Sequence, residues 1–396
     1  MTKQIQDAYI VKAVRTPVAK YKGAFKHIRP DDMLAHVLKG VVADHPEIAA
    51  NVEDVIVGCA MPEAEQGMNV ARIGILLAGF PDNVPGVTIN RFCSSGSQAV
   101  AMAADKIRLG EADVMIAAGT ESMTMVPMMG NKVSLNPNVF ADDNVAIAYG
   151  MGITAEKVAQ RWKVSREDQD IFAAESHTRA IAATEKGYFN DEILPYDIVT
   201  SHPSVDGLGI DTKKRLLTVD EGPRPGSTPE VLGKLRTVFQ ANGSVTAGNS
   251  SQMSDGAGAI LIVSEAALKK YNLEPIGRFV TSAVIGVEPE VMGIGPKEAI
   301  PLCLKRAGLN QDQLDWIELN EAFAAQALAV CNELGLDKSR VNPNGGAIAL
   351  GHPLGATGAI RTATLMSGLR RTGGKYGMVT MCIGTGMGFA MIIEAT

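Results

Sequence analysis

The sequence is poor in aromatic residues and cysteines and contains no long apolar segment. Aromatic side chains make up 5% of its 396 residues, and there are five cysteines. Because no run of about 18 apolar residues is present, we expect no membrane span. The cysteines are odd in number, widely spaced and without a CxxC pair, which fits reduced thiols. The first residues lack the apolar core of a signal peptide, so we expect a cytoplasmic protein.

Charge and metal-ligand patterns exclude two further classes of protein. Lys and Arg number 37 against 43 Asp and Glu, a net charge of −6, so no basic field attracts nucleic acid. The six histidines are scattered without the spacing of metal ligands, so we expect no metal site. Glycine is abundant instead, with 41 residues, which allows segments of backbone to pack closely together.

Strand-like apolar runs alternate with helix-like segments in both halves of the chain, which predicts an α/β fold. The first half has runs at 9–14, 54–59, 86–90 and 113–119 and a helix at 97–109, and the second has runs at 277–283, 315–320, 341–344 and 377–382 and a helix at 356–369. The step from Asp54 to Asp113 is 59 residues, and that from Asp315 to Tyr376 is 61. This near-equality favours a duplicated domain over chance similarity of two ordinary halves.

Residues 120–250 do not fit the repeat. Helical stretches at 154–162 and 166–186 precede a loop-rich segment, and an insertion of this length is usually a lid or a binding domain. The insertion carries a set of cations, which are Lys213, Lys214, Arg215, Arg224, Lys234 and Arg236. They indicate either an anionic ligand or a solvated surface.

Cys93 and His352 occupy matching places in the two halves. Cys93 lies where a strand turns into a helix, and helix N-terminal amides lower a thiol pKa, as an activated nucleophile requires. The alternative, a buried structural cysteine, is our interpretation of Cys59, Cys303 and Cys331. His352 lies in the glycine-rich loop 345–358 and could accept the proton of the Cys93 thiol. A phosphate-binding loop is the alternative, but the spacing matches neither common glycine motif.

Two other polar residues follow predicted strands. Cys382 ends a strand before a glycine turn, where a second thiol could move a proton and the amide of Gly384 could bind an oxyanion. A core cysteine followed by a plain turn is the alternative. Asn320 lies where a βα loop carries polar function in an open sheet, although Asn is also a common helix N-cap.

These segments together resemble the thiolase family. Four motifs carry the resemblance in the family's order: Cys93-Ser94-Ser95-Gly96, then Asn320 to Phe323, Gly351-His352-Pro353, and Cys382 to Gly386. The resemblance implies an α/β, five-layer αβαβα fold made of two duplicated halves and an inserted loop domain. We expect the first half to span 1–120 and 250–270, the loop domain 121–249, and the second half 271–396.

The resemblance also implies a role for each motif. Cys93 would accept the acyl group, His352 would be its base, and Cys382 would act as acid and base. Asn320 and His352 would hold a water in one oxyanion hole, and the amides of Cys93 and Gly384 would form the second. Coenzyme A is expected as a substrate, with no permanently bound cofactor, and its predicted contacts are Arg224, Leu235, Ala247, Ser251, Met151 and Phe323.

Details of two motifs distinguish branches of the family. The Ser after Cys93, together with Thr385, resembles the degradative branch, which implies thiolytic cleavage of 3-ketoacyl-CoA in fatty acid β-oxidation. The alternatives are an acetoacetyl-CoA thiolase running the biosynthetic Claisen condensation and a non-catalytic CoA-binding protein. Retention of both cysteines, the histidine and the asparagine argues against the last. A homodimer or homotetramer is expected, and hydratase and dehydrogenase subunits of β-oxidation are further candidate partners.

Overall fold

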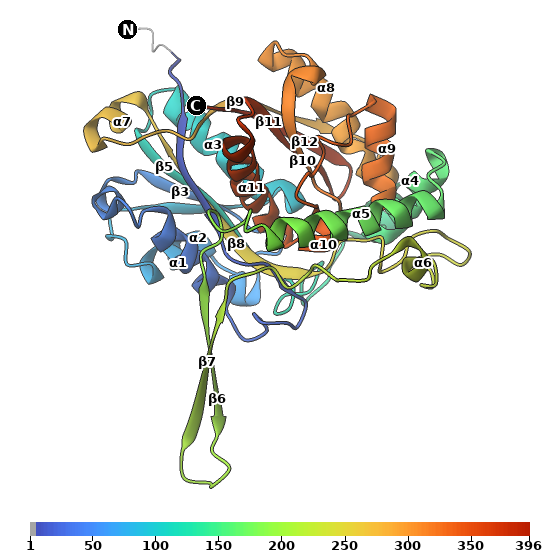
Figure 1. The fold of residues 1–396 in the computed structure, drawn as a ribbon, viewed down its shortest axis with the longest axis horizontal. Helices are drawn as coiled ribbons and strands as arrows, with labels where there is room; N and C mark the ends of the chain where they lie inside the picture. The colour runs from blue at the N-terminus through green and yellow to red at the C-terminus, as the bar shows by residue number, and fades with distance from the viewer. Residues whose placement is uncertain (1–4) are drawn as a thin grey trace.

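The computed structural model describes residues 5–396, and most of its strands form one mixed sheet (Figure 1). The strand order is β4-β3-β5-β8-β1-β9-β12-β11-β10, and β2 pairs with β8. The strands of the first half are β1 Tyr9–Arg15, β2 Ala19–Lys20, β3 Asp54–Gly58, β4 Gly86–Ile89, β5 Val114–Ser122 and β8 Ser254–Val263. Those of the second half are β9 Gly277–Gly286, β10 Leu314–Leu319, β11 Tyr376–Ile383 and β12 Met387–Ala395. The halves join where β1 pairs with the start of β9.

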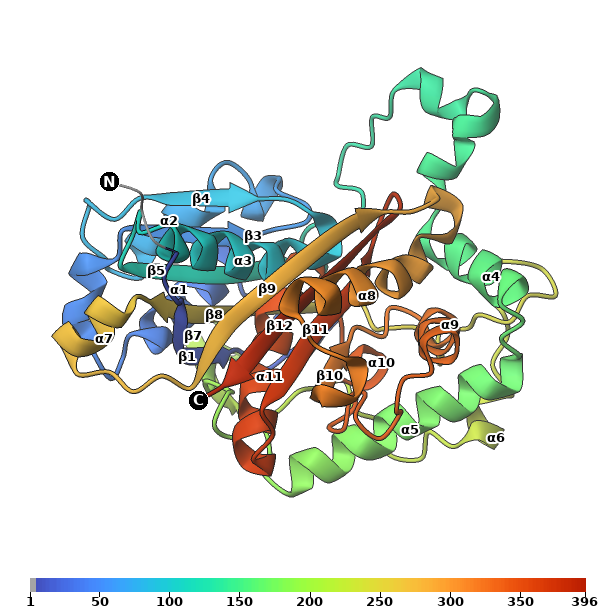
Figure 2. The ribbon, with the colours of Figure 1, turned by 90° about the horizontal axis from the view of Figure 1, so that it is seen from above.

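Helices complete five layers around the two halves of the sheet (Figure 2). The central layer is α3 Ser95–Arg108 and α11 Thr357–Thr372, which contact each other and strands of both halves. The outer layers are α1 Pro30–Val41 and α2 Val70–Leu77 on the first half, and α8 Gly295–Ala307 and α9 Ala324–Leu334 on the second. The remaining helices are α4 Met151–Arg161, α5 Arg166–Glu185, α6 Pro229–Leu232, α7 Glu265–Tyr271 and α10 Ala347–Leu350.

Short 3-10 turns join many of these elements. They are η1 Pro46–Asn51, η2 Ala64–Gln66, η3 Phe92–Ser94, η4 Pro137–Phe140, η5 Asp142–Ala148, η6 Pro289–Ile294, η7 Gln311–Gln313 and η8 Leu354–Ala356. Two of them, η3 and η8, lead directly into the central helices α3 and α11. The catalytic candidates Cys93 and His352 therefore lie at the entrances to the central layer.

The central helices approach each other through bare backbone. A Cβ added to Gly358 would lie 2.0 Å from the backbone N of Ser97, and one added to Gly96 would lie 2.7 Å from the N of Ala359. Because real Cβ atoms do not approach backbone so closely, both positions require glycine. This contact lies near the N-terminal ends of α3 and α11, and it brings the turns before the two helices together.

The structure contains the predicted repeat with one incomplete copy. β3, β4 and β5 are paired in parallel in the first half, whereas in the second β10 and β11 pair in parallel and no strand forms at 341–344. Val341 makes an isolated parallel bridge to Ile317 instead. Pro343 follows two residues later and has no N–H to donate to a ladder, which explains why this strand does not extend.

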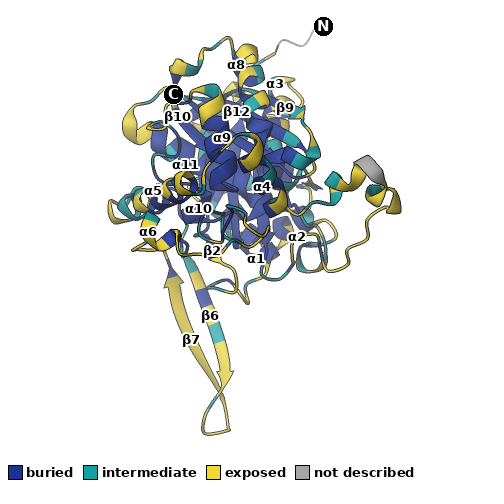
Figure 3. Cartoon of the chain, turned by 90° about the vertical axis from the view of Figure 1, so that its right-hand side faces the viewer, coloured by how far each residue is buried: buried dark blue, intermediate teal, exposed yellow. Residues whose placement is uncertain are grey.

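The segment after α5 differs from the loop that we expected there. It forms the antiparallel hairpin of β6 Tyr196–Pro203 and β7 Ile210–Leu217, which projects from the body of the protein (Figures 1 and 3). Most of its residues are exposed on both faces, so the alternation that marks a half-buried strand is missing from its sequence. In the described part of the chain, no helix is both long and apolar enough for a membrane crossing.

Candidate active site

Cys93 lies in the turn η3, between the end of β4 and the start of α3. Phe92 has a φ of 44°, and its backbone N donates to Oδ1 of Asn90 at 2.8 Å. Such a left-handed conformation is strained for a phenylalanine and is found mostly at functional sites. The turn directs Cys93, which is 7% exposed, into a cavity of about 430 Å³.

The lining of this cavity is mainly apolar and comes from five parts of the chain. It comprises Ala60 to Glu63, Asn90, Phe92, Cys93, Met128 to Gly130, Lys132 to Leu135, Ile147 to Met151, Leu354, Gly384 and Thr385. The methionines and aliphatic side chains of 128–135 and 147–151 line the same cavity as Cys93. The cavity can therefore take an apolar group next to Cys93.

Burial makes Cys93 a thiol rather than a thiolate in the free protein. Burial raises the pKa of Cys93 to about 11, although the backbone N–H groups of Gly384 and Cys93 favour the thiolate. The negative charge of Glu121 raises it further. Our expectation of a thiol pKa lowered by the helix N-terminus is therefore wrong for the free protein, because desolvation outweighs the amide contacts. A base is required at neutral pH.

His352 lies between α10 and η8 and is 4% exposed. Its Nε2 is 3.3 Å from Nδ2 of Asn320, and its Nδ1 is 2.7 Å from Oγ1 of Thr357. Since an amide nitrogen can only donate, Nε2 accepts and Nδ1 carries the proton that is donated to Thr357. Burial, and then the charge of Arg361, lower the pKa of His352 to about 3. The imidazole is therefore neutral at pH 7 and has a lone pair on Nε2.

Asn320 directly follows β10 and is 1% exposed. Its backbone N donates to the carbonyl of Thr380 at 2.9 Å, which ties it to β11. The side chain of Asn342 binds both backbone groups of the preceding Leu319, accepting at 2.9 Å and donating at 2.8 Å. Oδ1 of Asn320 is buried and has no protein partner among the described residues. Its Nδ2 therefore has a fixed direction, toward His352.

Cys382 and Gly384 lie at the β11–β12 turn. Cys382 is fully buried, and burial together with the nearby Cys93 raises its pKa. Gly384 lines the cavity, and the next residue, Thr385, has a φ of 66°. Since η3 packs against both η8 and β11, the structure brings the Cys93 turn next to the His352 loop and the Cys382 strand. His352, Asn320 and Cys382 lie behind the cavity wall that exposes Cys93.

Three of the predicted coenzyme A contacts lie at or near this site. Met151 lines the cavity at the start of α4. Phe323 is buried at the start of α9, and its ring meets that of Phe239 edge-on at 6.2 Å between centroids. The backbone N of Ser251 donates to the carbonyl of Ala322 at 2.9 Å, which holds its segment against the Asn320 loop.

The other three predicted contacts lie on the surface of the inserted segment. Arg224, Leu235 and Ala247 are exposed. The backbone N of Arg224 donates to Nδ1 of His177 at 3.2 Å, so the loop that carries this arginine is anchored while its side chain is free to meet a ligand. None of these three residues lines the cavity.

Sequence reasoning missed Thr357, Phe239 and Glu121. Glu121 is a charged residue two positions after the apolar run 113–119, and this position was a usable signal for a special role. Thr357 and Phe239 carried no such signal, because a threonine in a helix and an aromatic residue in a loop are ordinary. Their contacts depend on tertiary packing.

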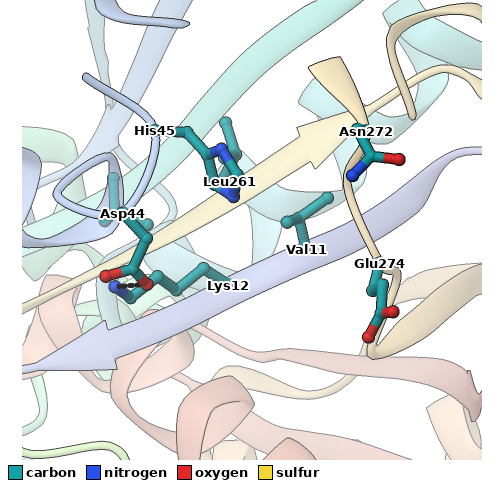
Figure 4. Close-up of a pocket in the computed structure, with 8 residues that line it drawn as sticks. Val11, Lys12, Asp44, His45, Leu261, Asn272 and Glu274 are labelled. Carbon is teal, nitrogen blue, oxygen red and sulfur yellow. Dashed lines mark hydrogen bonds and ion pairs between the residues drawn. The ribbon is translucent and has the colours of Figure 1, made fainter. Parts of the chain in front are cut away.

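A different cavity, of about 330 Å³, lies by β1, the end of α1 and the segment after α7 (Figure 4). Lys12 and Asp44 form an ion pair at 2.5 Å on its rim, and His45, Asn272 and Glu274 are the other polar residues. None of the predicted site residues lines it. Over the described residues, no group of three His, Cys, Asp or Glu side chains is placed to hold a metal ion.

Comparison with known proteins agrees with the geometry. Family models match at residues 8–266 (thiolase, N-terminal domain) and 273–395 (thiolase, C-terminal domain). The chain is 48% identical to the 3-ketoacyl-CoA thiolase of Bacillus subtilis over 98% of this chain and all of that one. Among solved structures it resembles human mitochondrial 3-ketoacyl-CoA thiolase (TM-score 0.88, 40% identity, 99% of both chains) and the Bacillus anthracis acetyl-CoA acetyltransferase (TM-score 0.89, 37% identity, 100% of both).

Proposed function

We propose, since the chain belongs to the thiolase family, that it is an acyltransferase that uses coenzyme A to cleave 3-ketoacyl-CoA into acetyl-CoA and a shortened acyl-CoA. The observation that carries this proposal is the position of Cys93 on an apolar cavity, beside Gly384, the His352 loop and the Cys382 strand. The similarity to 3-ketoacyl-CoA thiolases over the full chain supports it.

In the first half-reaction, Sγ of Cys93 attacks the 3-keto carbon of the substrate, and Nε2 of His352 accepts the thiol proton. The bond between carbons 2 and 3 then breaks and leaves the acyl group on Cys93. The electron pair of that bond leaves as the enolate of acetyl-CoA, which takes a proton from the Cys382 thiol. The raised pKa of Cys382 suits a group that carries a proton until the enolate forms.

The second half-reaction returns every proton. The Cys382 thiolate accepts the proton of the coenzyme A thiol, and the resulting thiolate attacks the acyl group on Cys93. The Cys93 thiolate that leaves recovers its proton from Nε2 of His352. Acyl-CoA departs, and all three side chains are restored.

Two sets of hydrogen-bond donors would stabilise the oxyanions that form in these steps. Nδ2 of Asn320 lies 3.3 Å from Nε2 of His352. Once Nε2 has taken the Cys93 proton, both nitrogens would be donors, and they would stabilise the thioester oxygen of the enolate as it gains charge. The backbone N–H groups of Cys93 and Gly384, which favour the Cys93 thiolate, would receive the oxygen of the attacked carbonyl. We further propose that Met151, Phe323 and Ser251 contact the pantetheine arm, together with the exposed Arg224, Leu235 and Ala247.

The alternative product specificity is that of an acetoacetyl-CoA thiolase, and the similarity to the B. anthracis acetyl-CoA acetyltransferase supports it. The apolar 128–151 wall favours longer acyl chains, because a four-carbon substrate would leave most of it uncovered. Comparing turnover of C4 with C8 to C16 3-ketoacyl-CoA separates the two. We expect higher kcat/KM for the longer chains, and activity confined to C4 would establish the alternative.

The acyl-Cys93 intermediate provides a direct test of the mechanism. After brief exposure to 3-ketoacyl-CoA without free coenzyme A, peptide mass spectrometry should find the acyl group on Cys93. Cys93→Ala should lose at least about 10³-fold in kcat while folding normally. The matched control is Cys303→Ala on α8, a buried cysteine away from the site. Acylation of Cys382 instead would reverse the roles of the two thiols.

We also propose a cytoplasmic location, a homodimer or homotetramer, and the division into two halves and a loop domain at residues 1–120 with 250–270, 121–249 and 271–396. The pairing of β8 with β1 and β5 supports assigning the segment after residue 250 to the first half. Light scattering coupled to gel filtration would measure the assembly, and limited proteolysis would test the boundaries.

A further inference from the structure

Glu121 is a buried carboxylate near the active site to which the reaction above assigns no step. It is the next-to-last residue of the central strand β5 and is 1% exposed. Among the described residues it takes part in no ion pair with Lys, Arg or His. A buried charge without a counter-ion is costly unless hydrogen bonds replace its hydration shell, so its contacts indicate what it does.

Every hydrogen-bond partner of this carboxylate is a donor, and the most distant is Sγ of Cys59, 3.9 Å from Oε1. Oε2 accepts from the backbone N of Ala60 at 2.7 Å and from that of Gly355 at 2.8 Å. Oε1 accepts from the backbone N of Met61 at 3.2 Å and from the side-chain amide of Gln66. A protonated carboxyl group or a glutamine would direct hydrogen atoms at one of these donors, so the site is built for the ionised form.

Gln66 is itself fixed in the orientation that this arrangement needs. Its Oε1 accepts from the backbone N of Ser122 at 2.9 Å, and its Nε2 also donates to the carbonyl of Met61 at 3.0 Å. Because the oxygen is already used, the NH₂ group must face Glu121. Burial raises the pKa of Glu121 above its ordinary value, and the hydrogen bonds from Ala60 and Gly355 offset only part of this rise. None of the four N–H donors can accept a proton from the carboxyl group, so the geometry favours the ionised form.

The donors belong to two different walls of the reaction cavity. Ala60 and Met61 line the cavity after β3, and the carbonyl of Ala60 accepts from Nδ2 of Asn90 at 3.0 Å. Asn90 in turn holds the turn that carries Cys93. Gly355 belongs to η8, directly after the His352 loop, and its neighbour Leu354 also lines the cavity. The carboxylate of Glu121 thus connects the segment beside the Cys93 turn to the segment beside His352.

The backbone around Gly355 is too closely packed to admit a side chain at this position. A Cβ added to Gly355 would lie 2.6 Å from the backbone N of Ala60 and 2.7 Å from Oε2 of Glu121. The two backbones meet across the carboxylate with no room for a side chain. Loss of the carboxylate would therefore allow the walls to separate, and small displacements at a reacting centre are expensive in rate.

We propose that Glu121 is a positioning residue of the reaction, whose ionised carboxylate fastens the Ala60–Met61 segment to Gly355 and so holds the Cys93 and His352 walls at a fixed separation. This inference rests on the proposed function, since it concerns the same site. It adds a residue that touches no substrate and acts through the two loops.

Glu121→Gln tests the inference, because the variant keeps the shape and removes the charge. We expect kcat for thiolysis to fall about tenfold to hundredfold with a smaller change in KM, and partial recovery in Glu121→Asp. The second readout is the pH dependence of Cys93 alkylation by iodoacetamide, followed by mass spectrometry. Its midpoint should move to lower pH, because the negative charge facing the thiol is gone while Arg91, His352 and Cys382 remain. Glu265→Gln, an exposed carboxylate on α7, is the control and should change neither readout.

A merely structural role makes a different prediction. If Glu121→Gln lowers the melting temperature but leaves kcat per folded molecule and the alkylation profile unchanged, the proposal is overturned. Alkylation does not require turnover, so absence of thiolysis in the wild type would defeat the proposed function and leave this readout intact.

Gly355→Ala provides the second variant if Glu121→Gln does not fold. It forces the junction open while keeping the charge, so kcat should fall about tenfold or more and the alkylation midpoint should not move to lower pH. Wild-type kcat in Gly355→Ala would overturn the proposal.

Discussion

The two halves of the molecule place different residues at the same position and use them differently. Glu121 is the next-to-last residue of β5, and Cys382 is the next-to-last residue of β11. Both are buried below the turns that enter the central helices. In the first half the residue is surrounded by backbone donors, and in the second it lies close enough to Cys93 for the charge of that group to raise the pKa of Cys382.

The turns before α3 and α11 differ in the same way. Cys93 lines the cavity, whereas His352 lies behind its wall and is held by Thr357 and Asn320. The duplicated fold thus has two similar turns before its central helices. The side chain of one turn, Cys93, lines the cavity, and that of the other, His352, lies behind the wall as the proposed base. The comparison teaches that equivalent backbone positions need not have equivalent chemistry.

Removing the proposed base, His352, should have the largest effect on activity. We expect His352→Ala to lower kcat/KM by roughly 10³-fold near pH 7, since burial keeps Cys93 protonated with a pKa of about 11. Because the thiolate fraction rises as pH approaches that value, the residual rate of the variant should increase with pH from 7 to 10. Wild type should show a much weaker increase over the same range. Steady-state kinetics across this range is the measurement.

The control is His202→Ala, at an exposed position on the β6–β7 hairpin. It should retain wild-type kcat/KM at every pH. A His352→Ala variant with a wild-type rate, or one without any rise toward alkaline pH, would contradict the assignment of His352 as the base for Cys93.

The second largest effect is expected where α3 and α11 meet, at Gly358. In Gly358→Ala the new Cβ would lie 2.0 Å from the backbone N of Ser97, and neither helix can yield without moving a catalytic turn. We expect a loss of about 3 kcal/mol in the free energy of unfolding, measured by urea denaturation. Gly373→Ala, at the end of the same helix α11, has open space around it and a φ of 69°, so it should cost only about 1 kcal/mol. Equal losses would show that backbone contact between α3 and α11 does not limit stability.

Much of this comparison could be predicted from the sequence. The segments around β3, β5, β10 and β11 are short, nearly continuous apolar runs, and motif residues such as Cys93 follow strands, so their positions depend on local signals. The missing strand at Val341 and the β6–β7 hairpin depend on Pro343 and on exposed backbone pairing, which a search for apolar runs does not detect. The raised pKa of Cys93 could not be predicted either, since it depends on burial.

The smallest expected effect concerns how His352 is oriented. Thr357→Val keeps the shape of the side chain but removes the oxygen that accepts from Nδ1 at 2.7 Å. The buried N–H would lose its partner, which favours rotation of the ring or the other tautomer, and we expect kcat to fall about tenfold. Thr357→Ser should restore most of the rate, because it keeps the hydroxyl group.

The matched control for this change is Thr362→Val, one turn further along α11. Its hydroxyl donates to the carbonyl of Gly358 at 2.7 Å, inside the helix and away from the imidazole. Steady-state kcat should therefore stay within about twofold of wild type, since a local helix contact carries little free energy. If the variants at positions 357 and 362 lose equal activity, the effect belongs to α11 as a whole and not to the orientation of His352. If only the variant at position 357 loses activity, the second half supports catalysis through one hydroxyl group, as we propose that the first half does through one carboxylate.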